Sequence, residues 1–127
     1  MANGFQGSPK EWERISSPLE KLDSILEKFA NEKGLPLAAN TKNWPDREFR
    51  WTFQIERLIQ IYLEDDKELT WTLWACAYQF RNSINMTKKK CLLKGVSIEE
   101  MQANLPEKLE EAYELVLGWN SGDLGSN

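Results

Sequence analysis

The spacing of hydrophobic side chains predicts a helix early in the chain. Apolar residues recur every three or four positions between residues 19 and 33, which is the spacing of one helical face. These residues are Leu22, Ile25, Leu26 and Phe29. Ser17-Pro18-Leu19-Glu20 has the pattern of a capping box with proline at the first helical position, and Gly34 suits the left-handed end of a helix. We therefore expect a helix from Ser17 to Lys33.

The period changes from three or four residues to two between residues 49 and 80. Hydrophobic and polar side chains alternate there, as expected for strands with one buried face. The pattern predicts three strands, at residues 49–56, 59–64 and 69–80. The polar run Glu64–Glu68 suits the turn between the second and third strands, whereas the join at Glu56-Arg57 has no glycine for a tight turn.

A helix is the alternative for the first two of these strands. Five of the same apolar residues also fall at helical spacing, and Pro45-Asp46 could begin such a helix. These residues are Trp51, Ile55, Leu58, Ile59 and Tyr62. We prefer strands because β-branched and aromatic side chains dominate and because the alternation continues beyond the helical pattern.

A second helix is predicted near the end of the chain. Ser97-Ile98-Glu99-Glu100 is a capping box, and a long apolar stripe at helical spacing follows it. The stripe consists of Met101, Leu105, Leu109, Ala112, Val116 and Trp119. We expect Pro106 to divide this segment into a short helix and a longer one. Residues 81–96 remain ambiguous: Arg81-Asn82-Ser83 suits a turn, and a further short strand or helix around Cys91-Leu92-Leu93 fits equally well.

Together the elements predict an α+β fold in the order α-β-β-β-α. We expect an antiparallel sheet of three strands, or of four or more, with both helices packed on one face. A chain of 127 residues has the size of one domain. We expect this domain to span residues 17–119, preceded by a flexible arm at residues 1–16 from which Trp12 and Ile15 dock on the body. Residues 120–127 are expected to form a disordered tail.

The alternation in the third strand leaves large rings on the face opposite the helices. Leu69, Trp71 and Leu73 suit the covered face, whereas Trp74, Cys76, Tyr78 and Phe80 point the other way. Tyr, Trp and Arg are enriched at recognition surfaces, and the opposite face would carry these residue types. We therefore predict a partner or ligand surface formed by Arg50, Gln60, Tyr62, Thr72, Trp74 and Tyr78. The alternative is that residues 81–96 or the N-terminal arm cover the rings and complete a second small core.

Composition narrows the possible partners. The net charge of −4 disfavours binding to nucleic acid or to anionic lipid. No apolar run is long enough to span a bilayer and the first residues do not resemble a secretory signal, so we expect a cytoplasmic protein without a membrane partner. Six tryptophans are many for this length, and they serve either a core or a binding surface.

The sequence offers little catalytic chemistry. It contains no histidine, which removes the commonest general base and every imidazole metal ligand. Cys91 follows three lysines but has no base to pair with, so we interpret both cysteines as idle thiols. The glutamates of the last helix spread over its solvated side, and no phosphate-binding glycine motif is present. We expect no catalytic residues, no metal site and no cofactor.

The element order, opened by Ser17-Pro18-Leu19-Glu20, resembles that of double-stranded-RNA-binding domains. Those domains use a basic run near the second helix. In this chain Lys88, Lys89 and Lys90 lie several residues before that helix, and Glu99 and Glu100 at its start would repel phosphate. The resemblance therefore does not extend to the nucleic-acid contacts.

We expect a non-enzymatic protein-interaction module, such as a small acidic adaptor, inhibitor or chaperone. Its polar-aromatic sheet face would bind a protein partner or a second copy of the chain, giving a homodimer. The alternative is a small-molecule-binding domain, conceivably an enzyme, with a pocket between the sheet and residues 81–96.

Overall fold

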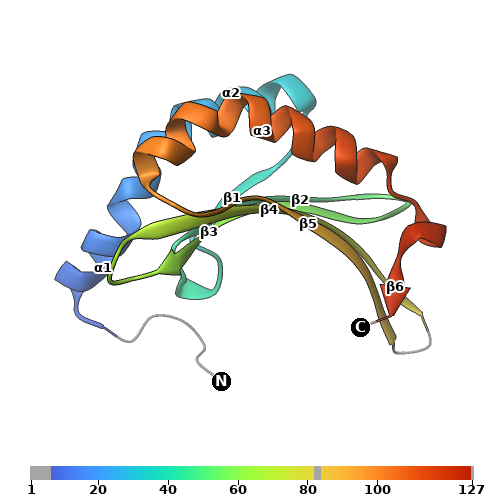
Figure 1. The fold of residues 1–127 in the computed structure, drawn as a ribbon, viewed down its shortest axis with the longest axis horizontal. Coiled ribbons are helices and arrows are strands. Elements are labelled where there is room, and N and C mark those ends of the chain that lie inside the picture. Colours follow the sequence, from blue (N-terminus) through green and yellow to red (C-terminus); the bar gives the residue numbers. More distant parts are fainter. Residues whose placement is uncertain (1–6, 82–83, 127) are drawn as a thin grey trace.

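The chain forms two layers, a sheet and a set of helices that cover one face of it (Figure 1). The computed structural model describes residues 7–81 and 84–126. The helical elements are α1 (Pro9–Ser16), η1 (Ser17–Leu22), α2 (Asp23–Lys33), η2 (Thr41–Asn43), α3 (Ile98–Gly118) and η3 (Ser121–Asp123). The strands are β1 (Leu37–Ala39), β2 (Asp46–Phe53), β3 (Ile55–Asp65), β4 (Thr70–Arg81), β5 (Ile84–Val96) and β6 (Gly125–Ser126).

The sheet is an antiparallel meander, in which each strand pairs with its neighbours in sequence order from β1 to β5 and β6 completes the far edge. It bends away from α2 and α3, so the face opposite these helices is concave (Figure 1). The α+β class, the antiparallel sheet and the helices on one face agree with the sequence analysis. The described residues form six strands, which agrees with the wider expectation of four or more, and the ambiguous segment supplies the longest of them, β5, with 13 residues.

The first hairpin turns two residues earlier than the sequence suggested. Phe53 pairs with Ile55, and the chain reverses at Gln54, which has a φ of 67°. The expected join at Glu56-Arg57 is wrong because both residues lie within β3, opposite Thr52 and Trp51 of β2. The helical alternative for this stretch is wrong for the same reason.

The second hairpin turns where the polar run predicted it. The Asp65 carboxylate accepts hydrogen bonds from the backbone N–H groups of Lys67 and Glu68, at 2.8 and 3.1 Å. These bonds lower the pKa of Asp65 below its ordinary value. Leu69 completes the reversal with a φ of 53°. An aspartate that bonds to the backbone two and three residues ahead thus takes the place of an Asp-Gly turn.

The main core lies between the sheet and the helices. The apolar stripes of α2 and α3 meet the covered face of β2, β3 and β4, as their periods predicted. The fully buried sheet residues include Ile59, Ile61, Trp71, Leu73, Ala75 and Ala77. No helix of the described residues is both long and apolar enough to cross a membrane.

Helix α3 is a single helix of 21 residues with Pro106 inside it. The expected division at Pro106 is therefore wrong. Proline removes one backbone donor from a helix, but Leu105 and Leu109 on either side are fully buried, and this packing favours helix on both sides of Pro106. The N-cap is confirmed, because the Ser97 hydroxyl accepts a hydrogen bond from the N–H of Glu100 at 3.1 Å.

Residues 9–16 of the expected arm form helix α1. Ser8 caps α1, and Ile15 of α1 is only 1% exposed, so the expected docking of Ile15 is observed. Arg14 donates to the carbonyl of Asp66 in the β3–β4 turn at 2.7 Å. The predicted capping box at Ser17 does not form, because residues 17–22 continue from α1 as the 3-10 helix η1. Residues 1–6 of the expected arm lie outside the described residues.

The expected C-terminal tail also has defined elements. Asn120 and Asp123 form a reciprocal capping box around η3, and Leu124 is 7% exposed. Gly125 and Ser126 then pair with Thr87 and Met86 of β5 as β6. The sequence did not predict η3 and β6 because residues 120–127 are mostly polar and, of the described ones, only Leu124 is buried. Asn127 lies outside the described residues.

Arg57 connects the sheet to the end of α3 on the covered face. This side chain is 1% exposed, and its guanidinium donates to the carbonyls of Phe53, Val116 and Trp119. Burial lowers its pKa below the ordinary arginine value. The last carbonyls of a helix carry partial negative charge, so a buried cation is stabilised at this position without a carboxylate partner.

Candidate functional site

We use the name open face for the concave side of the sheet, which α2 and α3 do not cover. Strand pairing arranges its side chains in rows that run across the strands. One row joins Arg50 of β2, Leu58 of β3, Cys76 of β4 and Lys89 of β5. A parallel row on one side joins Glu48, Gln60, Trp74 and Cys91, and on the other side Thr52, Glu56, Tyr78 and Thr87.

A groove of about 240 Å³ lies along the first of these rows. Its floor consists of Leu58 and Cys76, which are 6% and 5% exposed and do not belong to the main core. Trp74 and Tyr78 stand two positions to either side of Cys76 on β4 and form the walls. The remaining lining residues are Arg50, Phe80, Asn85, Thr87 and Lys89.

Each wall carries a cation on its ring. The Lys89 ammonium lies 5.6 Å from the centre of the Trp74 ring, and the Arg50 guanidinium lies 5.8 Å from that of Tyr78. Both distances are within the range of cation–π attraction. Arg50 also pairs with Glu48 at 2.9 Å and donates to the Tyr78 hydroxyl, and the Glu48 bond raises the pKa of Arg50 above its ordinary value.

A chain of hydrogen bonds fixes the Trp74 wall. The Trp74 indole donates to Gln60 at 2.7 Å, and the Gln60 amide donates to the buried carboxylate of Asp46 at 2.8 Å. Asp46 also accepts from the backbone and the hydroxyl of Thr41. The ring of Tyr62 meets Trp74 edge-on, with centroids 6.2 Å apart. This wall is therefore held in place in the unbound chain, which lowers the ordering cost of binding.

The structure places five of the six predicted site residues in two contacting sets, which meet at the groove that Arg50, Trp74 and Tyr78 line. Arg50 touches Tyr78, Gln60 touches Trp74, and Trp74 touches Tyr62. Thr72 is on the same face but is only 1% exposed. Its hydroxyl donates to Glu64 at 2.5 Å and accepts from the N–H of Gly95 at 3.1 Å, so it stabilises the β4–β5 pairing beneath the surface.

Several groove residues were absent from the sequence-based site. Cys76 and Phe80 had been assigned to this face but not to the site, and Leu58 had been taken as part of a rival helix. The contribution of β5 was missed because residues 81–96 had no assigned structure. Asn85, Thr87 and Lys89 are two residues apart, and this spacing was the one sequence feature that could have predicted a strand with these side chains on one face.

Neither alternative cover lies over the rings in the described part of the chain. Residues 84–96 extend the sheet beside β4 instead of folding across it. Helix α1 lies beside the β3–β4 turn, and Ile15 belongs to the main core. Phe80 consequently remains 69% exposed at the mouth of the groove. The side of Phe80 that is not in contact with Tyr78 is available to another molecule.

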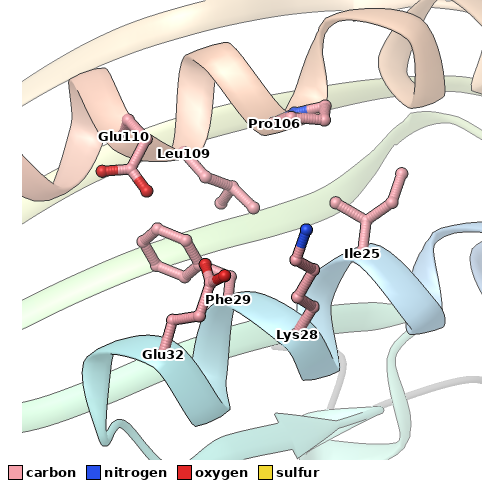
Figure 2. Close-up of a pocket in the computed structure, with 7 residues that line it drawn as sticks. All are labelled: Ile25, Lys28, Phe29, Glu32, Pro106, Leu109 and Glu110. Atoms are coloured by element: carbon pink, nitrogen blue, oxygen red, sulfur yellow. The ribbon is translucent and has the colours of Figure 1, made fainter.

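A second hollow lies between α2 and α3 and has a volume of about 290 Å³ (Figure 2). Its apolar lining consists of Ile25, Phe29, Pro106 and Leu109, with Lys28, Glu32 and Glu110 at the rim. Figure 2 shows the side chains of the two helices converging on this seam. Phe29 and Leu109 belong to the main core, so the hollow is a shallow part of the helix packing. It lacks the ring walls and the ordered polar network of the open-face groove.

Searches against protein-family models, curated proteins and solved structures find no match to the chain.

Proposed function

We propose that the chain is a non-enzymatic protein-interaction module that binds a protein partner on its open face. In this proposal an apolar side chain of the partner inserts between Trp74 and Tyr78 onto the floor of Leu58 and Cys76. The observation that carries the proposal is the groove itself, which has rigid aromatic walls, an apolar floor and an exposed Phe80 at its mouth. Aromatic and arginine anchors of this kind dominate the binding energy of protein interfaces.

The size of the groove favours a side chain over a free small molecule. Its volume of about 240 Å³ is below the range of roughly 300–1,000 Å³ that encloses drug-sized ligands. The groove is also open along the concave face, so it would bury only part of a small ligand. A protein partner can fill the groove with one residue and cover Phe80 with its neighbours.

The alternative of a small-molecule domain has less support from the geometry. It required a pocket between the sheet and residues 81–96, whereas residues 84–96 form β5 within the sheet. In the described part of the chain such a ligand would have to use the open groove or the shallow hollow between α2 and α3.

The proposal can be tested with a peptide library displayed against the purified chain. Selected peptides should carry a large apolar residue, and Tyr78→Ala and Phe80→Ala should each weaken their binding about tenfold or more, as expected for hot-spot truncations. Titration calorimetry measures this loss. Leu117→Ala is the matched control because Leu117 is an exposed apolar residue of α3, far from the groove residues in the fold, and should leave the affinity unchanged.

Three outcomes would overturn the proposal. Peptides that bind all three variants equally would place the docking surface elsewhere. A dimer in sedimentation experiments that Phe80→Ala dissociates would make a second copy the occupant. Binding of a metabolite, detected as a thermal shift that Tyr78→Ala abolishes, would favour the small-molecule alternative.

A further inference from the structure

The outer edge of β5 has unpaired backbone and a cluster of lysines. On its inner side β5 pairs with β4 along most of its length, whereas on its outer side β6 pairs only with Met86 and Thr87. From Lys88 to Lys94 no described strand lies against the outer edge. This stretch of seven residues is about 23 Å long at 3.3 Å per residue, which is enough for a further strand.

The same stretch forms a local basic patch on an acidic protein. It contains Lys88, Lys89, Lys90 and Lys94, all of which are exposed. No described residue forms an ion pair with any of them. The neighbouring positions of β4, from Trp74 to Tyr78, carry no charge. The net charge of the whole chain is −4, so this edge differs in sign from the molecule that carries it.

The lysines lie in a defined arrangement along the edge. Lys88 and Lys90 pair with Ala77 and Ala75, which face the main core, so both point to the helix-covered side of the sheet. Lys89 points to the open face, where it covers Trp74. A strand added to this edge would place alternate side chains beside Lys88 and Lys90, because both partners repeat every two residues.

The edge already accepts a strand at one end. Gly125 and Ser126 pair with it antiparallel to β5, and the pairing stops because Leu124 turns into the core and residues 121–123 form η3. The curvature of the sheet therefore does not prevent strand addition here. Lysines on edge strands commonly protect against pairing with like edges. In this chain a second copy of β5 would bring lysines against lysines, which is unfavourable.

We propose that the β5 edge from Lys88 to Lys94 binds an extended acidic segment of another protein as an additional strand. Main-chain hydrogen bonds would supply the pairing, and carboxylates at every second position would select the partner through Lys88 and Lys90. This site meets the groove only at Lys89, which lines the groove. Lys88, Lys90 and Lys94 do not line the groove, so either site can fail without the other.

The test uses a nine-residue peptide of alternating Glu and Thr, with blocked ends and a fluorescent label. Anisotropy should show binding that weakens about tenfold when Lys88, Lys90 and Lys94 are all changed to Glu, since each exposed ion pair contributes only a fraction of that factor. The matched control changes Lys10, Lys28 and Lys42 to Glu. These exposed lysines lie away from the edge, and the control alters the net charge equally.

A second probe separates strand addition from charge attraction. The same peptide with N-methyl groups on alternate backbone nitrogens keeps its charge but cannot pair along one side. It should bind at least tenfold more weakly, and only the unmodified peptide should slow amide exchange at alternate residues from Lys88 to Cys91, before the register shift at Leu92. Equal binding of the two peptides, equal effects of the two triple variants, or unchanged amide exchange would overturn the proposal. None of these outcomes depends on the groove.

Discussion

Trp71 and Trp74 lie three positions apart on β4 and point to opposite faces of the sheet. Trp71 is fully buried in the main core, whereas Trp74 is partly exposed on the open face and bonds to Gln60. The difference follows from the two-residue period of a strand, which separates odd from even positions. The same residue type therefore serves stability at one position and recognition, as we propose, at the other.

Truncation of the two tryptophans should separate these roles. Trp71→Ala should lower the free energy of unfolding by about 3–5 kcal/mol, the usual cost of removing a large buried ring. Trp74→Ala should cost less than about 2 kcal/mol because it removes a half-exposed ring and one hydrogen bond. Urea denaturation of both variants measures the difference. Equal losses would show that Trp74 is a core residue and that the open face is covered.

The two cysteines should differ in reactivity. Burial raises the pKa of the Cys76 thiol above its ordinary value, more than Lys89 and Arg50 lower it, so this thiol stays protonated at pH 8. Cys91 is exposed on β5. Iodoacetamide at pH 8 should alkylate Cys91 in the folded chain and leave Cys76 unmodified, as mass spectrometry of the digested protein would show. Both should react in urea. Rapid alkylation of Cys76 in the folded chain would mean that the groove floor is open to solvent.

At the scale of elements, the ends of the helices follow local chemistry. Gly34 ends α2 with a φ of 68°, a conformation that costs other residues free energy. Gly118 is the last residue of α3, where nothing lies within 4 Å of an added Cβ atom. An alanine side chain would therefore be strained at Gly34 and would fit without strain at Gly118.

Exchanging these glycines should change stability in opposite directions. Gly34→Ala should lower the free energy of unfolding by about 1 kcal/mol, since alanine is strained in the left-handed region. Gly118→Ala should leave it unchanged or raise it by up to about 1 kcal/mol, because alanine favours the helix. Thermal and urea unfolding of the pair would reveal the sign. A stabilising Gly34→Ala would contradict the observed end of α2.

The sequence predicted those elements whose two sides differ in burial. Trp71 and Leu73 are expected on the covered face, and the structure places them in the main core. Strand β5 was not recognised because most of its residues are exposed or only partly buried on both sides, which leaves no contrast for a two-residue period to reveal. The join at Gln54 was missed because local propensity gives no reason for a glutamine at positive φ.

The sequence predicted the site residues on β2, β3 and β4 but not those on β5. Arg50, Gln60, Tyr62, Trp74 and Tyr78 lie together because they belong to the strands whose faces were assigned. Thr72 was misjudged because alternation gives the face of a residue but not its depth, and a short side chain between larger ones becomes buried. Lys89 and Asn85 could not be included while the path of residues 81–96 was unknown.

At the scale of the whole molecule, the described helices pack against one side of the sheet (Figure 1). Trp71 and Trp119 are buried on that side, and Trp12 and Trp51 pack against the same core. Trp74 stands on the concave open face, and Trp44 is 38% exposed. In the described part of the chain the helices cover one face of the six-stranded sheet and leave the open face uncovered.

Hydroxyl-radical footprinting with and without a peptide selected on the purified chain tests this arrangement most directly. In the free chain Phe80 should be oxidised readily, as should Phe53, which is 53% exposed at the end of β2 and does not line the groove, while the buried Phe49 should be protected. Saturating peptide should protect Phe80 and leave Phe53 unchanged. Protection of Phe80 in the free chain, or its unchanged oxidation in the complex, would contradict an open face that docks a protein partner.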